Sequence, residues 1–97
     1  MTILYHPEFR KFTNDASAAM LLSYFWMLWK TTDHSTFEIT ISEIQTLTGL
    51  TRYEQQTARR ILEKLMILQT TRRGMPAQTI YNLDFEQVRN LLGGEHV

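Results

Sequence analysis

The sequence predicts a mainly α-helical fold with a small β-hairpin, and three observations lead to this prediction. The segment from Ala18 to Trp29 is almost entirely apolar, two Thr-x-x-Glu motifs stand eleven residues apart, and a Gly-Met-Pro turn separates two strand-like segments. The chain has 97 residues, of which 43% are apolar and 11% aromatic, which is typical of one globular domain. We therefore expect a single domain over residues 1–97, with an irregular N-terminal arm at residues 1–13 and a loose tail at residues 93–97.

The apolar segment predicts a long first helix from about Ala16 to about Lys30, capped by Asn14 or Asp15. Because this helix is apolar on nearly all sides, it must be covered on several of them. One interpretation is that the helix is central and the N-terminal arm packs over it. The alternative is that part of the segment from Ala18 to Trp29 forms the interface of a symmetric homodimer.

The middle of the chain predicts a short strand and two capped helices. Residues 37–39 alternate apolar and polar side chains, as a half-buried strand does. The sequence TISE at residues 40–43 is a capping box, and the short helix after it should end at Gly49. A second box, TRYE at residues 51–54, begins a longer helix that should end near Met66.

The remainder predicts a hairpin and a last helix. Residues 67–72 and 78–82 have strand-like composition, and the turn cluster at residues 73–77 lies between them. Asp84 can cap a short final helix that ends at Gly93 and the following glycine. Two capped helices joined by a tight glycine turn and followed by a hairpin match a winged helix-turn-helix.

Positive charge is concentrated in one third of the chain. The formal net charge of the whole chain is zero, but residues 49–75 hold six basic and two acidic side chains, a net charge of +4. Such segregation indicates a surface for a polyanion or an acidic partner. The overall neutrality argues against a protein that coats nucleic acid without discrimination.

The longer helix predicts a surface for double-stranded DNA. Its apolar residues share one side, and Arg and Gln occupy the other, as expected for a helix that enters the major groove. Any exposed amphipathic helix has a polar side, however, and Glu63 on that side weakens the argument. We predict that bases are read by Arg52, Gln55, Gln56 and Arg59, and that phosphates are contacted by Tyr53, Arg60, Lys64, Arg72 and Arg73.

Catalytic and metal-binding patterns are not evident. The absence of Cys removes a disulfide framework, a thiolate zinc site and a Cys nucleophile. The three His residues are scattered, and the neighbours Asp33, His34 and Ser35 cannot adopt the geometry of a catalytic triad. We therefore expect no enzyme activity, no metal and no cofactor.

The sequence predicts a cytoplasmic protein. The first residues lack the basic and apolar regions of a secretory leader, and twelve apolar residues are too few to span a bilayer. The absence of Cys fits a reducing compartment. We expect no membrane partner.

A resemblance extends this interpretation. The residues that carry it lie from Ile39 to Leu83 and include TGLTRYEQQTARRILEKL and RRGMPAQTIYNL. With the preceding helix rich in Leu and Trp, the resemblance covers about 80 of the 97 residues. In order and spacing these residues resemble the winged-helix domain at the N-terminus of phage and plasmid replication proteins, including replisome organisers of the DnaD-like type. The resemblance implies a phage or plasmid protein that binds DNA in replication or in transcription regulation.

One departure from that family leaves an alternative open. Replisome organisers usually carry a further C-terminal region that engages a helicase or its loader, and this sequence stops after one short helix. We therefore expect a small free-standing DNA-binding protein. The alternative is a winged-helix module that binds a protein of a replication or host defence complex, such as an anti-CRISPR-like inhibitor. The zero net charge and the abundant aromatic residues favour this alternative.

Overall fold

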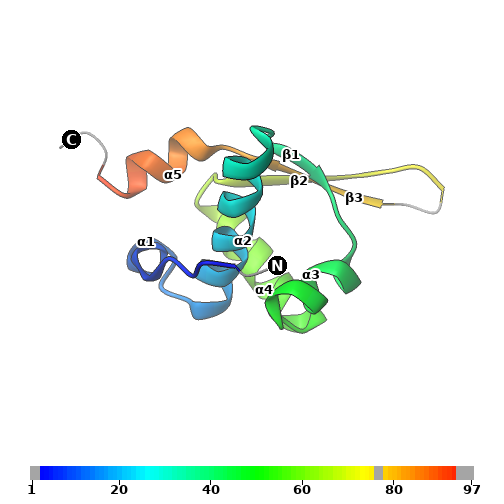
Figure 1. Ribbon diagram of the computed structural model, residues 1–97, viewed down its shortest axis with the longest axis horizontal. Coiled ribbons are helices and arrows are strands. Elements are labelled where there is room, and N and C mark those ends of the chain that lie inside the picture. Colours follow the sequence, from blue (N-terminus) through cyan, green and yellow to red (C-terminus); the bar gives the residue numbers. More distant parts are fainter. Residues whose placement is uncertain (1–2, 76–77, 94–97) are drawn as a thin grey trace.

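The fold consists of helices packed around a central helix, with a small sheet to one side (Figure 1). The computed structural model describes residues 3–75 and 78–93. In chain order, the elements are a 3-10 turn (Pro7–Phe9), α1 (Arg10–Thr13), α2 (Ala16–Thr32), β1 (Thr36–Glu38), α3 (Ile41–Thr48), α4 (Arg52–Lys64), β2 (Leu68–Arg73), β3 (Gln78–Leu83) and α5 (Phe85–Leu91). The predicted fold class is thus confirmed in its coarse form, a mainly helical fold with a small antiparallel sheet.

Helix α2 is the centre of the core. Asp15 caps it by accepting a hydrogen bond from the Ala18 amide at 2.9 Å, and the helix continues to Thr32, beyond the expected end at Lys30. Apart from the half-buried Met20, the residues from Ala18 to Phe25 are buried within the chain, as the central-helix interpretation expects. Residues 26–29 are half-buried. A homodimer through this helix stays a prediction, and its interface would have to use these residues.

The two capping boxes are confirmed. The Glu43 amide donates to Thr40 Oγ1 at 3.0 Å, and the Glu54 amide donates to Thr51 Oγ1 at 3.1 Å. Between the two helices, Gly49 adopts a φ of +80°, which a glycine reaches without the strain of a Cβ. These contacts set the tight turn from α3 into α4, and α4 ends slightly before the expected position.

The sheet has the strand order β1-β3-β2, and both pairs are antiparallel. Tyr81 in the central strand lies opposite Phe37 on one side and Thr70 on the other. The sequence predicted the hairpin and the short strand but not their pairing into one sheet. The predicted turn residues Pro76 and Ala77 lie outside the described residues.

The expectation of an irregular arm is wrong for residues 7–13. Pro7 begins a 3-10 turn that leads into α1, and Asn14 ends α1 at a φ of 53°. Phe9 is 1% exposed and Thr13 6%, so the segment packs on the core through these residues while Pro7, Glu8, Arg10 and Lys11 stay exposed.

The C-terminal prediction is confirmed in part. Asp84 caps α5 by accepting a hydrogen bond from the Gln87 amide, and α5 ends at Leu91. The second predicted stop, Gly94, and the tail from residue 95 lie outside the described residues. Of the helices in residues 3–75 and 78–93, none has the length and hydrophobicity needed to cross a membrane.

Candidate nucleic-acid interface

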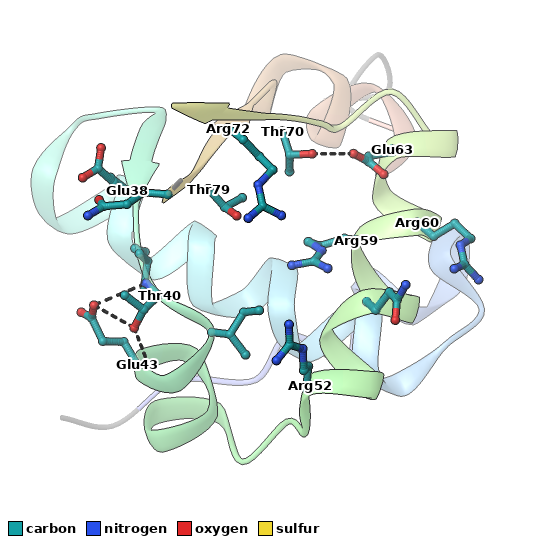
Figure 2. Close-up of a pocket in the computed structure, with 14 residues that line it drawn as sticks. Glu38, Thr40, Glu43, Arg52, Arg59, Arg60, Glu63, Thr70, Arg72 and Thr79 are labelled. Atoms are coloured by element: carbon teal, nitrogen blue, oxygen red, sulfur yellow. Dashed lines mark hydrogen bonds between the residues drawn. The ribbon is translucent and has the colours of Figure 1, made fainter. Parts of the chain in front are cut away.

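A charged groove lies between α4, the hairpin and the link from β1 to α3 (Figure 2). It has a volume of about 800 Å³ and is open to solvent. Most of its lining is polar. The lining residues are Glu38, Ile39, Thr40, Ile41, Glu43, Arg52, Gln56, Arg59, Arg60, Glu63, Thr70, Arg72, Gln78 and Thr79.

Helical spacing explains which side chains of α4 reach the groove. Arg52, Gln56, Arg59 and Glu63 follow one another at intervals of four, three and four residues, which places them on one face. The opposite face carries Ala58 and other apolar residues that are buried in the core. The packing of α4 on the core therefore fixes the direction in which its arginines point.

Strand alternation explains the contribution of the hairpin. Successive side chains of a strand point to opposite faces, so Thr70 and Arg72 share the groove face and Arg73 lies on the other. Thr79 lies directly opposite Arg72 in the register and also lines the groove. In Figure 2 the Arg72 and Arg59 side chains point into the space between the hairpin and α4.

The groove arginines have no carboxylate partner among the residues that the structure describes. Within residues 3–75 and 78–93, ion pairs join His6 to Glu8 and Arg89 to Glu86, and neither pair lies in the groove. A guanidinium presents a planar set of N–H donors that matches a phosphate or the edge of guanine. The cationic groups of the groove can therefore receive an anionic ligand without first breaking an ion pair.

Three carboxylates also line the groove, and of these the sequence placed only Glu63 there, on the polar side of the longer helix. Glu63 accepts a hydrogen bond from Thr70 Oγ1 at 2.9 Å, which ties α4 to β2. Glu38 and Glu43 lie on the side opposite Arg52 and Arg72 in Figure 2. The groove therefore has a basic wall along α4 and β2 and an acidic wall along β1 and the start of α3.

Glu43 had a signal in the sequence, because it belongs to the first capping box. Its charge also reaches the core: burial raises the pKa of Tyr24, and the negative charge of Glu43 raises that pKa further. Glu38 had a weaker signal, the polar position in the alternating pattern of the short strand. Neither signal places a side chain across a groove from α4.

The prediction that Gln55 reads a base is wrong. Gln55 is 1% exposed, and its Nε2 donates hydrogen bonds to the carbonyl oxygens of Ile41 and Leu50, both at 3.0 Å. The Gln55 side chain therefore connects α4 to the start of α3 and to the turn between α3 and α4. Its Oε1 atom is buried and accepts no hydrogen bond from any described residue.

The structure brings five of the predicted contact residues around one groove, namely Arg52, Gln56, Arg59, Arg60 and Arg72. Arg60 lies at its edge, and Figure 2 shows its side chain directed away from the centre. Three further predicted residues, Tyr53, Lys64 and Arg73, are exposed but do not line the groove.

The side chains of residues 3–75 and 78–93 contain no group of three or more His, Asp or Glu residues able to hold a metal ion. The groove presents guanidinium, amide, hydroxyl and carboxylate groups to solvent. Comparison of the chain with models of known protein families, with curated proteins and with solved structures gave no match.

Proposed function

We propose that the protein is a winged helix-turn-helix protein that binds double-stranded DNA. Helices α3 and α4 with their glycine turn would form the helix-turn-helix, and the β2–β3 hairpin would form the wing. In this arrangement α4 enters the major groove and the hairpin contacts the adjacent backbone.

The convergence of Arg52, Arg59 and Arg72 on one groove carries the proposal. These side chains come from a helix and from a strand that follows it, and no carboxylate of the described residues pairs with them. Cationic groups gathered in a concave surface raise the local concentration of anionic ligands. A DNA backbone is a polyanion that such a surface would attract.

The roles of individual residues follow from their positions. Gln56 and Arg59 lie on the exposed face of α4 and are the candidates for base contacts, Gln with adenine and Arg with guanine. Arg52 and Arg72 lie at the two ends of the basic wall and are assigned to phosphates. Tyr53, Lys64 and Arg73 are exposed outside the groove and remain assigned to a flanking backbone.

The resemblance of residues 39–83 to phage and plasmid replication proteins supports a role in replication or transcription regulation. A homodimer would place two α4 helices on two half-sites of one duplex. In that case the DNA site is a palindrome with half-sites about one helical turn apart.

Fluorescence anisotropy with a random-sequence duplex tests the proposal. We expect salt-sensitive binding by the wild type and much weaker binding by Arg59→Ala/Arg72→Ala, with the slope of log affinity against log salt reduced by about one because Arg72 is the phosphate contact of the pair. The matched control is Arg10→Ala/Lys11→Ala, which removes two exposed positive charges from α1 and should bind much like the wild type. No binding at low salt, or equal losses in both variants, contradicts the proposal.

The acidic wall of the groove favours a second candidate function, recognition of a protein with both charge signs. Glu38 and Glu43 would then pair with basic residues of the partner and the arginines with acidic ones. An inhibitor of a host defence complex is one such module. Glu38→Gln/Glu43→Gln separates the two candidates, because it should weaken binding of such a protein and should not weaken binding of DNA.

A further inference from the structure

The walls of the groove carry opposite charge, and this polarity restricts how a duplex can lie in it. Arg52, Arg59 and Arg72 lie on the wall formed by α4 and β2. Glu38 and Glu43 lie on the wall formed by β1 and the first turn of α3. Both carboxylates belong to exposed residues, so both are charged groups facing solvent at the rim.

We infer that Glu38 and Glu43 are specificity-determining residues that keep DNA phosphates off one wall of the groove. The inference rests on the proposed function. A phosphodiester backbone is attracted to the α4–β2 wall and repelled by the β1–α3 wall, so one strand of the duplex is held in a single position. The α4 side chains Gln56 and Arg59 then meet base edges in one register.

The range of the repulsion supports this assignment. Charges at a protein surface interact over about 10 Å at 0.1 M salt, so carboxylates on one wall of a groove repel phosphates that lie within it. Like charges that face each other across an interface disfavour incorrect binding arrangements, and in this way they increase specificity. Glu38 and Glu43 therefore lower the affinity for all duplexes and lower it most for duplexes that make poor base contacts.

The third carboxylate of the groove has a different role. Glu63 belongs to the α4 wall and accepts the hydrogen bond from Thr70 Oγ1. It holds β2 against α4 and thereby positions Arg72 relative to Arg59. Its substitution would change the geometry of the basic wall, so it is left unchanged in the test.

The chain permits a charge-matched experiment. Glu38→Gln/Glu43→Gln changes the net charge by two units, and Gln at position 43 can still complete the capping box of α3. The control Glu8→Gln/Glu86→Gln makes the same change in net charge at the N-terminal turn and on α5, away from the hairpin (Figure 1). Thermal unfolding of both variants checks that the fold is kept.

Affinity for a random-sequence duplex is measured by anisotropy at 50 mM and 200 mM salt. We expect the groove variant to bind about tenfold more tightly than the wild type at the lower salt and about twofold more tightly at the higher. The control should change by less than about twofold. Selection of bound duplexes from a random library should show weaker sequence bias for the groove variant than for the wild type and the control.

The outcomes separate the inference from the proposed function. Equal gains in the groove variant and the control mean that overall charge is responsible, which overturns the inference. Binding by the wild type with no gain in the groove variant overturns it as well. Absence of binding by all three proteins at low salt instead overturns the proposed function and leaves a protein partner as the occupant of the groove.

Discussion

The two ends of the molecule use their cationic side chains in different ways. At the end formed by α5 and the second half of α2, Lys30 Nζ lies 4.7 Å from the centroid of the Trp29 ring and the Arg89 guanidinium lies 5.2 Å from it. Phe85 stacks on Trp29 at 4.5 Å with an interplanar angle of 7°. At the hairpin end, Arg59 and Arg72 face an open groove.

This difference separates cations that hold the fold from cations that are available to a ligand. A cation over an aromatic ring at an exposed site contributes about 0.5–1 kcal/mol, and it is already engaged before any partner arrives. Among the described residues, the groove arginines pair with neither an aromatic ring nor a carboxylate. Sequence charge counts treat both sets alike, whereas only the structure assigns them to different tasks.

Truncation at the two ends should give the largest contrast. Phe85 is 5% exposed and contacts Trp26 and Trp29, so we expect Phe85→Ala to lower the free energy of unfolding by about 3 kcal/mol. In contrast, Arg59→Ala/Arg72→Ala should change that free energy by about 0.5 kcal/mol or less. Urea unfolding followed by circular dichroism measures both.

The comparison would fail if the two variants lost similar stability. In that case the arginines would be part of the structure, and their loss from a binding assay would not identify a DNA surface. A matched control at the aromatic end is Glu86→Gln, which leaves the rings in place and should be close to the wild type in stability.

Adjacent glutamines sharpen the contrast within α4 itself. Gln55 is buried and donates to two backbone carbonyls, whereas Gln56 is exposed and lines the groove. We expect Gln55→Ala to lower the free energy of unfolding by about 1–3 kcal/mol, because the carbonyls of Ile41 and Leu50 lose their donor. The same measurement should show a change of about 0.5 kcal/mol or less for Gln56→Ala.

Duplex binding supplies the second half of this test. Gln56→Ala should reduce sequence discrimination while the fold is unchanged, because its amide is proposed to contact a base. Equal stability of the two variants would contradict the anchoring role of Gln55. Unchanged discrimination in Gln56→Ala would remove that residue from the proposed base contacts.

The parts of the fold that depend on short spacings were predictable. Asp15, Thr40, Thr51 and Asp84 all cap helices as expected, because a cap needs only an acceptor side chain and an amide three residues later. The hairpin was predictable for the same reason. Its strands and turn are neighbours in the chain.

The site was predictable only in part because its walls are assembled over long distances. Gln55 is buried by contacts with Ile41, fourteen residues earlier, and a helical wheel of α4 contains no information on that contact. Glu38 reaches the groove because β1 pairs with β3, a strand more than forty residues later. Strand order therefore decided which acidic residues face the arginines, and local pattern did not.

The smallest expected effect links the acidic wall to the core. Tyr24 is buried on α2, and burial together with the charge of Glu43 raises the pKa of its hydroxyl above the ordinary value of 10.0. The unfolded state therefore releases this proton first as the pH rises. The free energy of unfolding is unaffected by Tyr24 below about pH 10 and falls above it, where the unfolded state binds fewer protons.

The free energy of unfolding is measured in urea at about pH 8 and about pH 10.5 for the wild type, Tyr24→Phe and Glu43→Gln, and the loss between the two pH values is compared. The wild type should lose more stability between the two pH values than Tyr24→Phe, since the other three tyrosines are common to both. Glu43→Gln should lie between them, because it removes the smaller, electrostatic cause and leaves the burial of the ring in place. Equal losses in the wild type and Glu43→Gln, with a smaller loss in Tyr24→Phe, would show that the charge of Glu43 does not act on Tyr24. Equal losses in all three proteins would show that the pKa of Tyr24 is not raised.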